Sequence, residues 1–163
     1  PAPWKRLLTT EFLHDYASAG QLVFLKDTCC DFELIHERID ATRGTPLKIY
    51  NANCQSWYDT LCYGAAGYSG VMANFHPDLY KYCVTHKDSD PEKAKLVADF
   101  LCLAGMIERT CYPVSCKYYH QLNGVKMSTY CRSADRANLL NAAKEEVWSL
   151  ISLENHIRAM IAG

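Results

Sequence analysis

Residues 22–35 read LVFLKDTCCDFELI, and this stretch joins a strand pattern to a helix pattern. The apolar run LVFLK at 22–26 is typical of a strand, and the spacing from Asp31 onward predicts an amphipathic helix with Asp31 as its N-cap. We expect a second strand at LKIY, residues 47–50, and a third within GYSGVMANF, residues 67–75. Strands that alternate with helices of about ten residues indicate βαβ units and a parallel sheet.

The remaining pattern is helical. SWYDTLCYG at 56–64 places Trp57 and Leu61 on one helical face, and Gly64 is a suitable C-terminal stop. From His76 onward the apolar spacing is helical in PEKAKLVADFLCLAGMIERT (91–110), PVSCKYYHQLNG (113–124) and RANLLNAAKEEVWSLISLENHIRAMI (136–161). Pro91 and Pro113 stand where the first turns of helices accept proline. The sequence therefore predicts an α/β first half and a helical second half.

Composition excludes several classes of protein. The chain has 163 residues, of which 49% are hydrophobic, and this is the size of one globular domain. Its 17 basic and 18 acidic residues are spread along the chain, so we expect neither nucleic acid nor a membrane surface as a partner. No apolar run is long enough to span a bilayer. The N-terminal PAPWKRLLTTEF lacks the apolar core of a secretory signal, and we expect a cytoplasmic protein.

The nine cysteines stand in apolar or aromatic surroundings without a repeated CxxC pair, and we expect reduced, buried thiols. Cys29, Cys30 and His36 offer a metal site as an alternative. Adjacent cysteines rarely bind one ion tetrahedrally, however, and no second pair supports them. We therefore expect neither a metal nor another cofactor.

Lys26 is the most unusual local feature, because it ends an apolar run. Catalytic groups of α/β barrels stand at such strand ends. If Leu22, Phe24 and Lys26 share one face, burial lowers the pKa of the lysine and leaves a neutral amine that can attack a carbonyl. A strand-end lysine that extends into solvent is the alternative.

Three parallel strands also leave open edges, so either more strands precede Pro1 or another chain completes the sheet.

The segment VFLKDTCCDFELI resembles strand six of the dihydrodipicolinate synthase and N-acetylneuraminate lyase family, in which the lysine forms an imine with a 2-keto acid. Residues 47–80 resemble that family's strand seven, helix seven and strand eight. Tyr112-Pro113-Val114, with Lys117, resembles the proline-containing helix start of its C-terminal region. The resemblance implies a (β/α)8 TIM barrel, of which this chain holds strands six to eight plus the C-terminal helical extension. Residues 1–75 are then the C-terminal part of the barrel, and residues 76–163 are its last helix and the extension of the same domain.

The family resemblance implies an enzyme and its site. The activity is that of a class I, Schiff-base-forming lyase or aldolase that acts on pyruvate or a related 2-keto acid and on aldehydes, in a homotetramer or dimer. The resemblance implies that Lys26 is the catalytic residue. The substrate-binding residues are Thr28, Asn53, Ser69 and Gly70.

Several positions depart from the family pattern. Cys54-Gln55 replace the Asp-Glu pair of sialic acid lyases, which argues against a sialic acid substrate. Pro3 and Cys30 replace an arginine and a glycine of dihydrodipicolinate synthases, which argues against that reaction. Pro1 resembles the proline of the family's YxxP motif, whose tyrosine shuttles protons, so we expect a fragment of a longer chain. A catalytically silent member that serves as a binding or scaffolding protein is the second hypothesis.

Overall fold

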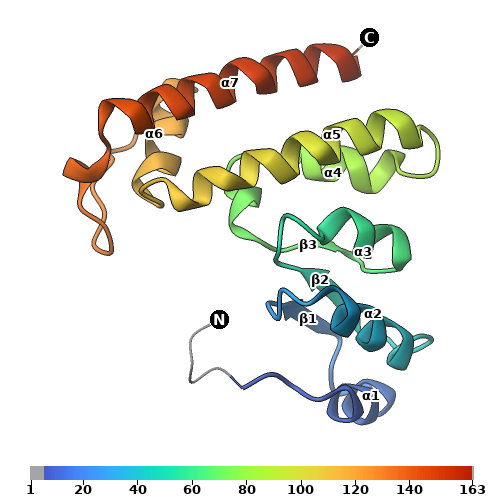
Figure 1. Ribbon diagram of the computed structural model, residues 1–163. Helices are drawn as coiled ribbons and strands as arrows, with labels where there is room; N and C mark the ends of the chain where they lie inside the picture. The colour runs from blue at the N-terminus through green and yellow to red at the C-terminus, as the bar shows by residue number, and fades with distance from the viewer. Residues whose placement is uncertain (1–5, 163) are drawn as a thin grey trace. The chain divides into compact units, whose positions relative to one another are not determined.

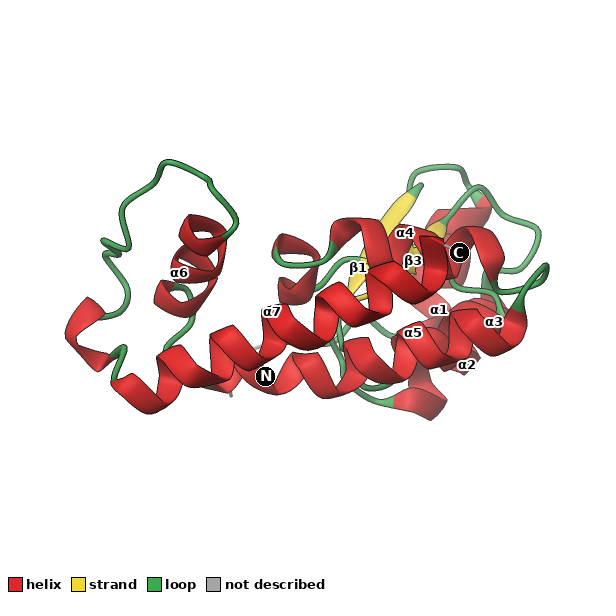
Figure 2. Ribbon diagram, turned by 90° about the horizontal axis from the view of Figure 1, so that it is seen from above, coloured by secondary structure: helices red, strands yellow, loops and turns green. Residues whose placement is uncertain are grey.

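The structure is a computed structural model that describes residues 6–162 of the chain. The chain divides into two compact units, with the boundary between Gly70 and Val71. The first unit is α/β and the second is helical. Figure 2 shows this difference, since its strands all belong to the first unit.

The first unit alternates helices and strands around a small parallel sheet (Figure 1). β1 pairs with β2 and β2 with β3, so the order in the sheet follows the order in the chain. The elements are α1 (Thr10–Ser18), β1 (Phe24–Asp27), α2 (Phe32–Ala41), β2 (Lys48–Asn51), α3 (Trp57–Tyr63) and β3 (Gly67–Tyr68). The predicted βαβ pattern is confirmed.

Side-chain caps fix where the helices of this unit begin. Asp31 accepts a hydrogen bond from the Leu34 backbone N–H at 3.0 Å, which confirms its predicted N-cap role for α2. Thr9 caps α1 in the same way through the backbone N–H of Phe12. Gly64 follows α3 with a positive φ of 138°, as expected of a helix stop.

The two faces of the sheet differ in burial. Leu25 and Ile49 face the helices and pack in an apolar cluster with Ile35 and Ile39 of α2. Phe24 and Lys48, which are register partners, lie on the opposite face and are exposed. Successive strand residues point to opposite faces, so the helices of the first unit pack on one face of the sheet, and Phe24 and Lys48 belong to the other.

The third predicted strand is largely wrong. Only Gly67 and Tyr68 pair with β2, and residues 71–74 form the 3-10 helix η1 (Val71–Asn74). The chain bends at Gly70, where the Tyr68 hydroxyl and the Ala52 carbonyl leave no room for a Cβ. The apolar run that follows is then buried through Met72 by a helical turn instead of a strand.

The second unit is helical, as predicted, and no strand occurs in it among the residues that the structure describes. Pro91 opens α5 as predicted, and Pro113 directly precedes α6. Besides η1, its elements are α4 (Pro77–His86), α5 (Pro91–Ala104), η2 (Gly105–Arg109), α6 (Val114–Leu122), η3 (Arg136–Asn138) and α7 (Asn141–Ala162). Among residues 6–162, no helix is both long and apolar enough to cross a bilayer.

A buried polar network fixes the core of the second unit. Glu154 of α7 is 2% exposed and accepts hydrogen bonds from the Tyr119 hydroxyl at 2.7 and 2.8 Å. The Nδ1 atom of His76 lies 3.0 Å from the same carboxylate, and Arg158 also contacts it. The network therefore ties α6 and α7 to the start of α4 in addition to apolar packing.

All nine cysteines are free thiols. The prediction that they are buried holds for Cys29, Cys54, Cys83 and Cys116. It is wrong for Cys30 and Cys62, which are exposed because they lie in the β1–α2 loop and on the outer side of α3.

Candidate active site

The predicted site residues lie at the carboxyl ends of the three strands. Lys26 is the second-to-last residue of β1, and Thr28 follows that strand directly. Asn53 comes two residues after β2, while Ser69 and Gly70 follow β3. Because parallel strands end at the same edge of a sheet, the structure brings all five residues to one edge of the first unit.

Lys26 is exposed, and the expected burial of its amine is not found. Phe24, on the same face, is 55% exposed. The prediction that Leu22 shares this face with Phe24 and Lys26 is wrong. It precedes the first residue of β1, so the strand alternation does not extend to it, and it packs with the helix-side cluster.

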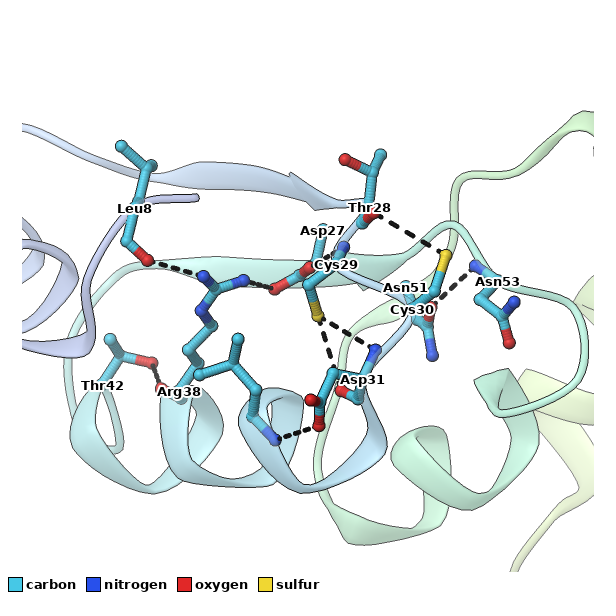
Figure 3. Close-up of polar contacts among 11 residues, drawn as sticks. Leu8, Asp27, Thr28, Cys29, Cys30, Asp31, Arg38, Thr42, Asn51 and Asn53 are labelled. Atoms are coloured by element: carbon cyan, nitrogen blue, oxygen red, sulfur yellow. Dashed lines mark hydrogen bonds and ion pairs between the residues drawn. The ribbon is translucent and has the colours of Figure 1, made fainter. Parts of the chain in front are cut away.

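A buried ion pair holds the chain immediately after Lys26. Asp27 and Arg38 of α2 are 2% and 3% exposed, and their side chains meet at 2.5 Å (Figure 3). The second oxygen of Asp27 accepts the Cys29 backbone N–H at 2.9 Å. Arg38 also donates to the Leu8 carbonyl at 2.6 Å. The end of β1 is thus joined to α2, to its own loop and to the segment before α1.

The cysteine nearest to Lys26 on the helix side is not a reactive thiol. Cys29 is 9% exposed, and its Sγ donates to the Asp31 carbonyl at 3.4 Å. Burial raises the pKa of the Cys29 thiol to about 11. At neutral pH the Cys29 thiol therefore remains protonated.

Polar side chains shape the turn after β2. The buried Asn51 amide donates to Ser56 Oγ and Thr60 Oγ1, both at 3.0 Å, and its Oδ1 accepts the Asn53 backbone N–H at 2.8 Å. Asn53 Oδ1 in turn accepts the Ser56 backbone N–H at 3.0 Å. Both amides thus stabilise the loop that leads into α3. Asn53 therefore has a structural role in addition to its predicted role in substrate binding.

The turn after β3 is equally constrained. Ser69 donates its backbone N–H to the Asn51 carbonyl at 2.9 Å, which extends the β2–β3 pairing by one step. Gly70 has no space for a side chain beside the Tyr68 hydroxyl and the Ala52 carbonyl. This close approach gives Gly70 a steric reason to be glycine, independent of any ligand.

The sequence analysis missed the residues that support the site. Arg38 carried a readable signal, because it lies three residues after Ile35 and next to Ile39 on the apolar face of α2. A charged residue in such a stripe must find a buried partner, and Asp27 at the strand end is an acidic candidate. Asn51 carried a similar signal as a polar residue that ends the apolar run LKIY.

Two positions named in the sequence analysis, Pro1 and Pro3, lie outside the described residues. They carried the comparison with the YxxP motif and with the synthase arginine. Within residues 6–162, no three histidine, cysteine, aspartate or glutamate side chains gather closely enough to hold a metal ion.

Comparison with known proteins gives the family. The model of the dihydrodipicolinate synthetase family matches residues 6–152, which is most of the chain. A comparison with curated proteins finds no significant match.

Solved structures share the fold at low sequence identity. The dihydrodipicolinate synthase of Thermotoga maritima is 18% identical with a TM-score of 0.76, and the match covers 91% of this chain and 51% of that one. The enzyme of Acinetobacter baumannii, solved with pyruvate, is 18% identical with a TM-score of 0.74 and coverages of 88% and 49%. The 4-hydroxy-tetrahydrodipicolinate synthase of Methylacidiphilum fumariolicum is 15% identical with a TM-score of 0.78 and coverages of 94% and 51%.

The chain thus spans about half the length of the structures that it matches. These relatives imply a TIM-barrel family, and the α/β architecture of the first unit agrees with it. The family match includes the strand that carries Lys26. The chain belongs to the dihydrodipicolinate synthetase family.

Proposed function

We propose that this chain carries the imine-forming lysine of a pyruvate-dependent class I lyase or aldolase, and that this lysine is Lys26. Lys26 is on the sheet face opposite the helices of the first unit, at the edge where Thr28, Ser69 and Gly70 also lie. This placement is the observation that carries the proposal. The family match and a relative solved with pyruvate support the same class of substrate.

The chemistry follows from the amine. The unprotonated Lys26 nitrogen attacks the carbonyl carbon of the 2-keto acid, and the carbonyl electron pair moves to oxygen, which takes up a proton. Loss of water from this carbinolamine gives the imine. Once protonated, the imine accepts the electron pair released when a carbon–carbon bond breaks, and the reverse flow forms that bond.

The architecture that we propose is the C-terminal part of a barrel. β1, β2 and β3 correspond to strands six to eight, and the helices of the second unit to the last barrel helix and the C-terminal extension. The coverage of about half of each solved relative supports this assignment. Further barrel strands beside β1 would cover Phe24 and Lys26, and burial would then favour the neutral amine that attack requires.

The proposed partners are small 2-keto acids and aldehydes, with further barrel strands and a homo-oligomer around them. One matched structure is described as a monomeric dihydrodipicolinate synthase variant, so assembly has to be measured for this protein itself. Light scattering with size-exclusion chromatography measures it, and we expect a dimer or tetramer. A cytoplasmic location stays a prediction from the sequence.

The test is trapping of the imine in the natural full-length protein. Incubation with pyruvate and borohydride should reduce the imine to a stable adduct, which peptide mass spectrometry should locate on Lys26. Lys26→Ala should abolish both adduct and turnover. Lys48→Ala is the matched control, because Lys48 is an exposed lysine on the same sheet face, at the opposite end of β2. Full activity in Lys26→Ala would rule the proposal out.

A catalytically silent binding or scaffolding protein is the second candidate, and the turn after β2 favours it. Cys54, at a position where sialic acid lyases carry a substrate-binding acid, is 4% exposed. Gln55 accepts the Asn53 side-chain amide at 3.0 Å. A substrate panel of pyruvate aldol products and keto-sugar acids decides between the two, since a silent protein turns over none of them and forms no adduct.

A further inference from the structure

Tyr50 is the side chain placed opposite Lys26. The two residues are register partners in the β1–β2 pair, and each is the second-to-last residue of its strand. The alternation that turns Leu25 and Ile49 toward the helices turns Lys26 and Tyr50 to the opposite face. Neighbouring strands are about 4.8 Å apart, so the Lys26 and Tyr50 side chains start from adjacent points on the same face.

Two neighbours hold the Tyr50 ring. Phe24 packs against it with a centroid separation of 5.0 Å and an angle of 32° between the ring planes. On the other side, Gly67 is the register partner of Tyr50 in β3, and a Cβ at Gly67 would lie 3.3 Å from two carbons of the ring. The glycine thus leaves the ring the room that a side chain would take, and the phenol has a defined place on the sheet.

The hydroxyl of Tyr50 is not used by the fold. Among residues 6–162 it makes no hydrogen bond, although the side chain is half-buried. Other tyrosine hydroxyls differ, since Tyr63 donates to Asp40 at 2.6 Å and Tyr119 to Glu154 at 2.7 Å. A phenol that the structure positions but does not pair is available to a ligand on this face.

We propose that Tyr50 is a further catalytic residue, whose hydroxyl donates a hydrogen bond to the carbonyl oxygen of the 2-keto acid as Lys26 attacks it. This inference rests on the proposed function, because it needs the adduct at Lys26. As the C–N bond forms, the carbonyl electron pair moves onto oxygen, and a donor at that oxygen stabilises the developing negative charge. The same donor polarises the carbonyl before attack. Tyr50 therefore accelerates formation of the carbinolamine.

The test compares rates of imine formation in the natural full-length protein. With saturating pyruvate, Tyr50→Phe should reach the same final amount of borohydride-trapped Lys26 as the wild type. Its rate should be at most about one tenth of the wild-type rate, because the variant lacks one hydrogen-bond donor at the developing charge. Tyr63→Phe is the matched control, since it removes a hydroxyl from an exposed tyrosine of α3, and its rate should not change. A wild-type rate in Tyr50→Phe overturns the inference and leaves the role of Lys26 intact.

A second measurement needs no change at Tyr50. In Lys26→Ala the bound pyruvate keeps its carbonyl oxygen, and a crystal structure of that complex should place Tyr50 Oη within about 3 Å of it. A separation beyond hydrogen-bonding distance overturns the inference even if Tyr50→Phe proves unstable. Absence of any trapped adduct in the wild-type protein is a different result, because it removes the proposed function and the role of Tyr50 with it.

Discussion

Replacing Arg38 by methionine should destabilise the protein strongly, because it leaves a buried carboxylate without its partner. The Asp27 and Arg38 side chains are 0% and 4% exposed, and water cannot replace the lost guanidinium. Removing one member of such a pair costs about 3–5 kcal/mol of unfolding free energy. We expect the lower end, because Asp27 keeps the hydrogen bond from the Cys29 backbone N–H. The Leu8 carbonyl, which also loses Arg38, lies in an exposed segment and can bind water.

Arg43→Met provides the matched control. Arg43 contacts Asp40 at 2.6 Å, nearly the same distance, but these side chains are 64% and 51% exposed. Exposed pairs contribute about 0–1 kcal/mol, so this variant should stay close to the wild type. The double variant Asp27→Asn/Arg38→Met should be more stable than Arg38→Met alone, because it removes the unpaired charge as well.

Urea unfolding of the natural full-length protein, followed by circular dichroism, measures these differences from the midpoint and the m-value. The reasoning is refuted if Arg38→Met costs no more than Arg43→Met. It is also refuted if the double variant is less stable than Arg38→Met, since the penalty would then not come from the isolated carboxylate.

Two further predictions concern the second unit. Burial and the hydrogen bond to Glu154 raise the pKa of Tyr119 above its ordinary value of 10.0, so the stability that this phenol contributes is present below pH 10 and lost as the pH rises above it. Tyr119→Phe should therefore be about 1–3 kcal/mol less stable than the wild type at pH 8. When unfolding is measured from pH 8 to pH 11, the difference in unfolding free energy between the two proteins should become smaller. The hydrogen bond with Ser133 lowers the pKa of Cys131, whereas burial raises that of Cys116 to about 11. Iodoacetamide at pH 7.5 should alkylate Cys131 well before Cys116 in a peptide-mapping time course, and equal rates would contradict this.

Local signals in the sequence were sufficient to predict most of the first unit. The alternation at Leu25 and Ile49, the cap at Asp31 and the stop at Gly64 each act over a few residues, so each can be read from the chain alone. The helix α1 carried signals of the same kind and was missed. Its Thr9 cap and the buried Leu13 and Ala17, four residues apart, form a short amphipathic pattern.

The remaining features depend on contacts between distant residues. The close approach of the Ala52 carbonyl to Gly70, directly after β3, is not revealed by any spacing within residues 67–75. The partner of Asp27 lies eleven residues away on another element. The exposure of Lys26 depends on what lies over its face of the sheet, and a period-2 pattern identifies a face without showing what covers it.

The sequential strand order of the sheet has a topological consequence. Because β1, β2 and β3 stand side by side in the order of their synthesis, no strand from elsewhere is threaded between two of them. Further strands can join at the free edge of β1 or of β3 without opening an existing pair, and they can leave in the same way. The topology therefore permits the three strands to pair as one block before any further strand joins either edge.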